Sequence, residues 1–128
     1  MSQKIINSTG WVLTAVIALL FGMSAFMKIT ANETVIAQAA EVGIDAKTYF
    51  LIGIIEIVSL ILFIVPRTGV LGTLLLAAYM GGAIATHLEH QQPIAMAVAV
   101  QVLVWITAVL RFPELKERLL ASPKTTQS

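Results

Sequence analysis

Glu56 is the residue whose type and position most strongly point to chemistry. It lies in the middle of an apolar run, Ile54-Ile55-Glu56-Ile57-Val58. An ionisable side chain at membrane depth costs roughly 2.5–3.5 kcal/mol or more, and such residues usually mark a site or a buried pair. We therefore expect Glu56 to have polar partners on neighbouring helices, and we predict that it is the proton acceptor of a site.

Tyr79 and Gln101 are the predicted partners because they lie at the same depth as Glu56. Each of the three stands eight positions inside the expected outer end of its helix, which is about 12 Å at 1.5 Å per residue. Three interpretations remain open: a hydrogen-bonded knot that fixes helix register, an outward-facing pocket that binds a polar head or handles a proton, and contact with a partner protein. On the same helix faces as Glu56, Tyr79 and Gln101, at spacings of three, four or seven, lie small or polar residues and one tryptophan: Gly53, Ser59, Gly82, Thr86, Ala97 and Trp105.

Lys28 closes the first apolar segment on the outer side and shares one helix face with Ser24 and Phe21. A lysine at a helix end commonly extends to the lipid headgroups. Alternatively, Lys28 points inward and pairs with Glu56, which lowers the cost of burying both charges. The sequence leaves both orientations open.

His87 and His90 are the two histidines of the chain and stand three positions apart at one helix end. Together with Glu89 they do not complete a metal site, so we predict none. His87 is instead expected to be a hydrogen-bonding residue at the mouth of the pocket. The full predicted ligand-binding set is Tyr79, Gln101, Lys28, His87, Ser24, Gly82 and Trp105.

Four apolar segments must position these residues. They span about residues 6–28, 48–65, 69–88 and 93–111, each close to the ~20 residues that cross a ~30 Å hydrocarbon core. The 128 residues are 58% hydrophobic and 12% charged, and each segment is apolar all round, which argues against a soluble four-helix bundle. We predict an all-α integral membrane four-helix bundle in a single domain, 1–112, followed by a cytoplasmic tail, 113–128.

A short amphipathic helix is expected between the first two segments. Apolar residues recur at helical spacing between positions 35 and 40, and Gly43 fits a helix C-cap. Residues 30–33 have the pattern of a capping box. Such a helix is expected to lie on the membrane surface or over the mouth of the bundle.

The distribution of lysine and arginine predicts the orientation. With four spans, the side that holds both termini carries six of these residues, and the other side carries two, Lys28 and Lys47. The positive-inside rule then places both termini in the cytoplasm, and we expect a bacterial-type cytoplasmic (inner) membrane. A net charge of +1 gives no reason to expect nucleic acid as a partner; membrane lipid is the expected neighbour.

The chain contains no cysteine, which excludes a thiol–disulfide relay carried by the chain itself. Small residues repeat every fourth position at Ala77, Gly81 and Ala85, and again at Ala18 and Gly22. Such repeats permit close approach of helices. Packing within the bundle is the favoured interpretation, and a homo-oligomer interface is the alternative.

Several short segments stand in a distinctive order along the chain. They are residues 21–28, 53–56, 66–72, 78–83 and 86–88, with Trp105 and Arg111. This order resembles the DoxX-like family of small four-helix membrane proteins, although Ala25 stands where glycine is expected in many relatives. The resemblance covers roughly residues 10–115 and implies the architecture more securely than the activity.

The same resemblance implies two kinds of function. Relatives are linked to quinone-coupled thiosulfate oxidation and to membrane oxidoreductase complexes, and more distant relatives act as assembly chaperones or cargo receptors. We therefore expect a subunit of a membrane redox system that binds a quinone-like or lipid-like ligand and works with a membrane or soluble oxidoreductase. The alternative is a non-enzymatic assembly factor that packs against a partner's helices. Whether the chain is an enzyme stays open, and a pump or channel would need a continuous polar path that the sequence lacks.

Overall fold

The described part of the chain is mostly helical and contains no strand. The computed structural model describes residues 2–30 and 33–120. Six α-helices stand where the sequence predicted four spans and one short helix, and the additional one, α6, occupies the start of the predicted tail. In order they are α1 (Gln3–Ile29), α2 (Glu33–Glu41), α3 (Ala46–Ile64), a 3-10 turn η1 (Pro66–Thr68), α4 (Gly69–Glu89), α5 (Ala95–Arg111) and α6 (Pro113–Leu120).

Three segments are long and apolar enough to cross a membrane. The first is α1, the second is α3, and the third is the continuous run of η1 and α4. The helix α5 has 17 residues, or about 26 Å, and reaches the length of a span only together with α6, from which it is bent by 111°. Large apolar side chains point outward along these helices: Leu19 is 66% exposed, Phe26 67% and Met96 75%. Such a surface is expected to face lipid.

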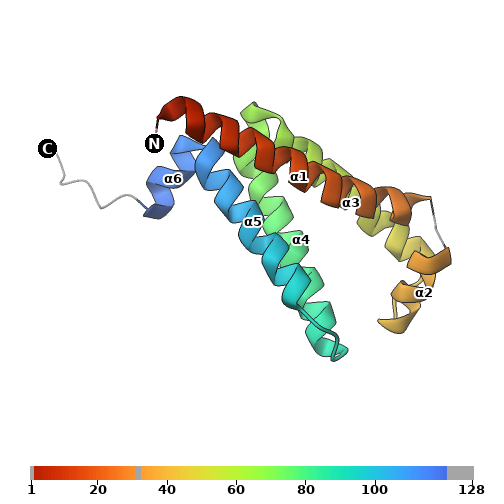
Figure 1. The fold of residues 1–128 in the computed structure, drawn as a ribbon. Coiled ribbons are helices and arrows are strands. Elements are labelled where there is room, and N and C mark those ends of the chain that lie inside the picture. Colours follow the sequence, from red (N-terminus) through yellow and green to blue (C-terminus); the bar gives the residue numbers. More distant parts are fainter. Residues whose placement is uncertain (1, 31–32, 121–128) are drawn as a thin grey trace, which may run out of the picture.

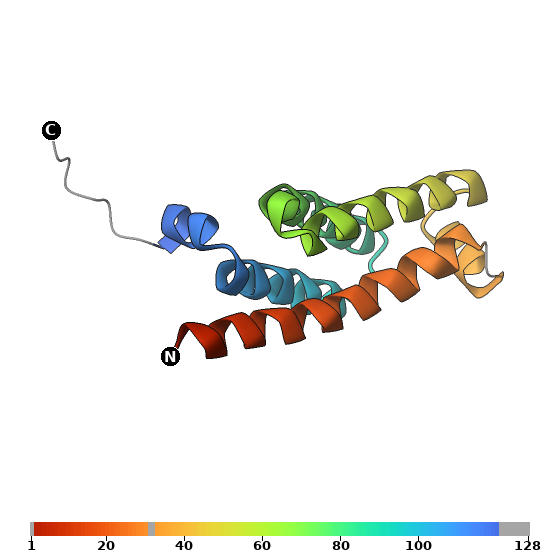
Figure 2. The same cartoon turned by 90° about the horizontal axis from the view of Figure 1, so that it is seen from above.

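The four long helices form two pairs that meet at one end of the molecule. The helix α1 packs against α3 and α5, and α4 packs against the same two helices. The α4–α5 pair and the α1–α3 pair lie close together at the end that carries the N-terminus and α6. They move apart toward their other ends (Figure 1). The view from above also shows the N-terminus and α6 at one end and α2 at the other (Figure 2).

Glycines explain the close approach of helices where the pairs meet. A Cβ on Gly72 of α4 would lie 2.1 Å from the backbone nitrogen of Phe63 on α3, so this contact requires a residue without a side chain. In contrast, a Cβ on Gly22 or Gly81 would have no neighbour within 4 Å among the described residues. The prediction that the small-residue repeats pack helices within the chain is therefore wrong for Gly22 and Gly81.

Arg111, at the end of α5, fastens this end of the molecule. Its guanidinium donates 2.9 Å hydrogen bonds to the carbonyls of Phe63 and Ile64 in the last turn of α3. It also lies 4.2 Å from the centre of the Trp11 ring and 4.6 Å from that of Phe112. The cation thus satisfies carbonyls that have no partner within α3 and joins α1, α3 and α5.

At the opposite end, α2 and α4 stop in the same way, with a left-handed residue after the helix. Gly43 follows α2 with φ of +76°, which confirms the predicted glycine cap. Gln91 follows α4 with φ of 58°, and it is the one non-glycine residue with positive φ in the described chain. Because a Cβ disfavours this conformation, the α4–α5 link is locally strained.

Two further local predictions differ from the structure. The last long helix begins at Ala95, so Pro93, expected in its first turn, precedes the helix. The predicted capping box includes residues 31–32, which lie outside the described residues. Its first member, Thr30, is the C-cap of α1, and its hydroxyl donates to the carbonyl of Phe26.

Candidate functional site

The buried carboxylate of Glu56, which is only 1% exposed, is the acceptor of three hydrogen bonds. Lys28 Nζ and Tyr79 OH each lie 3.1 Å from Glu56 Oε1, and Ser24 Oγ lies 3.3 Å from it. Lys28 also donates to the hydroxyl of Ser24. We call these four residues the Glu56 cluster. Since all three neighbours donate to one oxygen, the geometry fits an ionised carboxylate paired with the lysine ammonium.

Lys28 points into the protein. Its side chain is 10% exposed, and Nζ lies 5.2 Å from the centre of the Tyr49 ring and 5.8 Å from that of Tyr79. Of the two orientations that the sequence left open, the structure has the inward one. The hydrogen bond from Tyr79 to Glu56 likewise agrees with the predicted common depth of these two residues.

Ser24 differs from the four fully buried serine and threonine hydroxyls of the long helices. Each of those donates to the carbonyl four residues earlier in its own helix, at distances of 2.7–2.8 Å. Such bonds satisfy the hydroxyl locally. The Ser24 hydroxyl instead connects α1 to the carboxylate on α3. The self-satisfied residues are Thr14, Ser59, Thr73 and Thr107.

The start of α3 is fixed by Asp45, outside the apolar segment. Its carboxylate accepts a 2.9 Å hydrogen bond from the backbone N–H of Thr48. Hydrogen bonds from Thr48 hold the pKa of Asp45 below its usual value of 3.8. From this cap, Tyr49, Gly53 and Glu56 follow at spacings of four and three, on one face of α3.

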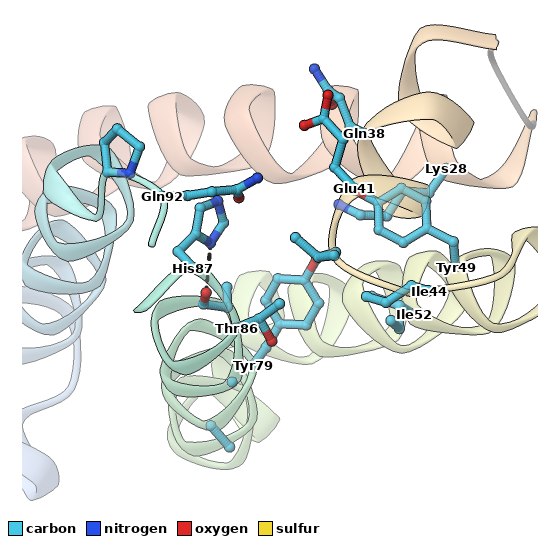
Figure 3. A pocket seen from close by; sticks show the side chains of 15 residues that line it. Lys28, Gln38, Glu41, Ile44, Tyr49, Ile52, Tyr79, Thr86, His87 and Gln92 are labelled. Carbon is cyan, nitrogen blue, oxygen red and sulfur yellow. Dashed lines mark hydrogen bonds between the residues drawn. The ribbon is translucent and has the colours of Figure 1, made fainter. Parts of the chain in front are cut away.

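A pocket of about 730 Å³ lies beside the Glu56 cluster. Figure 3 shows Lys28 and Tyr49 on one side of it, with His87 and Gln92 across from them. Its lining comes from α1, the α2 region, α3, α4 and the α4–α5 link. The lining residues are Lys28, Gln38, Glu41, Val42, Ile44, Tyr49, Ile52, Ala78, Tyr79, Gly82, Ala83, Thr86, His87, Gln92 and Pro93.

The pocket meets the Glu56 cluster at two side chains. Lys28 and Tyr79 belong both to the cluster and to the pocket lining, whereas Glu56 and Ser24 lie behind them. A molecule in the pocket would therefore contact the ammonium and the phenol directly. Glu56 could act on such a molecule only through these two groups.

His87 borders the pocket from α4. Its Nδ1 lies 2.6 Å from the carbonyl oxygen of Ala83. A carbonyl only accepts, so Nδ1 carries the proton, and in the neutral ring Nε2 is left as an acceptor. Within residues 2–30 and 33–120, no three His, Asp or Glu side chains gather in a way that could hold a metal ion.

Gln101 and Trp105 lie apart from the pocket lining. Gln101 donates a 3.1 Å hydrogen bond to the carbonyl of Ala77, and its Oε1 is buried without a partner among the described residues. Trp105 is half-buried and packs against the hydrophobic core. Gly82, also in the predicted set, does line the pocket.

The sequence prediction missed four polar or aromatic residues of the pocket lining. They are Tyr49 of α3, Gln38 and Glu41 of α2, and Gln92 of the α4–α5 link. The spacing of Tyr49 with Glu56, seven positions on one helix face, was a signal that could have identified it. Gln38, Glu41 and Gln92 carried no comparable signal, because they reach the pocket through the path of the connections.

A family model described as the DoxX-like family matches residues 12–109, most of the chain. The chain belongs to the DoxX-like family. The match includes the Glu56 cluster and all of the pocket lining, and it ends before α6. No curated protein and no solved structure gives a significant match to this DoxX-like protein.

Proposed function

We propose that this DoxX-like protein is a subunit of a membrane redox system that binds a quinone-like or lipid-like molecule in the pocket beside Glu56. The observation that carries the proposal is the end of the pocket at the Glu56 cluster, which we call its closed end because Lys28 and Tyr79 are backed there by the buried Glu56. A volume of about 730 Å³ is within the range of small-molecule sites. Tyr49, Ile52 and Ala78 supply an apolar and aromatic wall.

The residues at the closed end fit the head of a quinone. Lys28 can donate a hydrogen bond to a carbonyl oxygen, and the Tyr49 ring beside it offers a surface for a flat head group. A bound quinone would supply the redox chemistry, with electrons from an oxidoreductase partner. In the chain itself, Tyr79 connects the pocket to Glu56, so this pair can move a proton between the ligand and the carboxylate.

We place the protein in a bacterial-type inner membrane as a four-span bundle, with α5 as the fourth span. The end of the molecule that carries the N-terminus and α6 holds most of the basic residues, including Lys4, Arg67 and Lys116 (Figure 1). By the positive-inside rule this end faces the cytoplasm. The pocket then opens toward the outer side, and α6 lies along the cytoplasmic surface.

Mass spectrometry of the protein purified in a mild detergent tests the proposed ligand. We expect near-stoichiometric quinone in the organic extract. Quinone no more abundant than in an unrelated membrane protein purified in parallel would refute quinone binding, and a specific neutral lipid in its place would select the lipid-like ligand.

A second candidate function is that of an assembly factor that packs against the helices of a partner. It is favoured by Gly22 and Gly81, where an added Cβ would meet no described residue within 4 Å although small residues permit close helix contact. The same purification distinguishes the two candidates. A stoichiometric membrane protein partner without bound quinone would favour assembly, whereas quinone without such a partner favours ligand binding.

A further inference from the structure

The closed end of the pocket has a donor but no net charge. Lys28 Nζ lies 3.1 Å from Glu56 Oε1, and the Glu56 carboxylate is buried directly behind it. At this distance the negative charge of Glu56 offsets part of the attraction that Lys28 would exert on an anion in the pocket. A lysine that faces a pocket without such a partner would attract an anion; here the attraction is offset.

Lys28 nevertheless keeps the ability to donate. An ammonium has three N–H groups, and within the described residues two of them have partners, one being Glu56 and the other Ser24. The third can reach a ligand, because Lys28 is also part of the pocket lining. The phenol oxygen of Tyr79, whose proton is directed to Glu56, is left to accept.

The rest of the lining adds formal negative charge. Glu41 of α2 is exposed and lines the pocket beside Gln38 (Figure 3). The remaining polar lining residues add no formal charge, with histidine counted as neutral. Lys28, Glu56 and Glu41 together therefore give the site a formal charge of −1.

From these contacts we infer that the pocket selects a neutral head with a carbonyl oxygen that accepts a hydrogen bond, and that it rejects an anionic head. This inference rests on the proposed function, since it names the head-group chemistry of the same ligand. A quinone and a neutral lipid ester share the required carbonyl. A fatty acid or an acidic phospholipid does not fit. Its negative charge would be repelled by Glu41, and the one cation at the closed end, Lys28, is already paired with Glu56.

Binding of matched probes to the purified full-length protein tests this selection. The probes are laurate and methyl laurate, which differ in head charge and share one chain, and a short-tailed ubiquinone. Gly82→Leu, which fills the pocket, gives the background from detergent. We expect wild type to bind the ester or the quinone at least about tenfold more tightly than laurate at neutral pH. Whether the ester or the quinone binds more tightly identifies the source of the carbonyl.

Removal of one negative charge at a time should change this preference in a defined direction. In Glu56→Gln the charge of Lys28 is no longer cancelled, so laurate affinity should rise about tenfold while the affinity for neutral probes changes less than about threefold. Glu41→Gln, on the surface, should give a smaller gain for laurate. Adding Lys28→Gln to Glu56→Gln should remove the gain. These are gains of binding, which an unfolded variant cannot produce.

Two results would overturn the inference in distinguishable ways. Laurate bound as tightly as the neutral probes by wild type, or no gain in Glu56→Gln and Glu41→Gln, would refute charge selection while the proposed pocket ligand stands. If wild type bound neither neutral probe above the Gly82→Leu background, the selection and the proposed function would both be wrong.

Discussion

Gly53 of α3 faces Lys28 of α1 so closely that a Cβ at position 53 would lie 2.9 Å from the Lys28 Cβ. Gly53 stands one turn before Glu56 on the same helix face. The missing side chain therefore allows α1 and α3 to approach at the level where the ammonium of Lys28 reaches the carboxylate of Glu56.

Gly53→Ala should destabilise the protein by about 1–3 kcal/mol, because the contact is with the rigid base of a side chain. It should also weaken ligand binding by moving Lys28 away from Glu56. Gly22→Ala is the matched control on α1, where a Cβ would meet no atom of the described chain within 4 Å. There the better helix propensity of alanine should leave stability unchanged or raised by up to about 1 kcal/mol. Thermal unfolding in detergent measures both, and equal stability of the two variants would contradict the close contact.

Lys28→Met should cost about 3–5 kcal/mol, since it leaves the buried Glu56 carboxylate without its cation. Glu56→Gln should cost less, because the amide oxygen still accepts hydrogen bonds and Lys28 borders the pocket. We expect this variant to keep the fold and to lose quinone-coupled function.

The double variant, Lys28→Met with Glu56→Gln, should be more stable than the sum of the two single losses predicts. Additive losses in a thermal-unfolding cycle would show that the ion pair does not form, and wild-type function in Glu56→Gln would mean that the cluster only fixes helix register.

Gln91→Gly should stabilise the protein by about 0.5–1 kcal/mol, because glycine tolerates the positive φ of this position after α4. The matched change at the other helix end is Gly43→Ala, which places a Cβ in the same backbone region and should destabilise by about 1 kcal/mol. Both are read from melting temperatures. A decrease in melting temperature for Gln91→Gly would show that the link does not adopt this conformation in the membrane protein.

The orientation can be measured with single cysteines, since the chain has none of its own. With any outer membrane permeabilised, an impermeant thiol reagent on intact cells should label Gln91→Cys and should leave Ser2→Cys and Ser128→Cys unlabelled. All three should react after the cells are broken. The reverse pattern of labelling in intact cells would invert the proposed topology.

Depth along a helix could be predicted from the sequence, whereas the partner that each side chain contacts could not always be. Glu56 and Tyr79, placed at one level by a count of residues, are hydrogen-bonded in the structure. Gln101 was placed by the same count, yet it faces the carbonyl of Ala77 on α4. The helix α5 begins two residues later than predicted, which also shifts the depth of Gln101. A count fixes the rise of 1.5 Å per residue but not the contacts that set the rotation of each helix.

Features that depend on the meeting of distant segments were likewise beyond the sequence. The bond from Arg111 to the carbonyls of Phe63 and Ile64 joins residues at least 47 positions apart. Gln38, Glu41 and Gln92 line the pocket because of where the α2 region and the α4–α5 link lie. The helices themselves follow from local composition, so they were predictable; the divergence of the two pairs, which creates the pocket, follows from long-range packing.

Filling the pocket without disturbing the helices is the most direct test of ligand binding beside Glu56. Gly82 lines the pocket, and its neighbour Gly81 does not. At either position a Cβ would meet nothing within 4 Å in the part of the chain that the structure describes. Gly82→Leu should weaken binding of a short-tailed ubiquinone about tenfold or more, while Gly81→Leu should bind it as wild type does, with both variants equally stable. Equal quinone affinity of Gly82→Leu and Gly81→Leu, measured by titration of the purified proteins in detergent, would contradict a ligand site in this pocket.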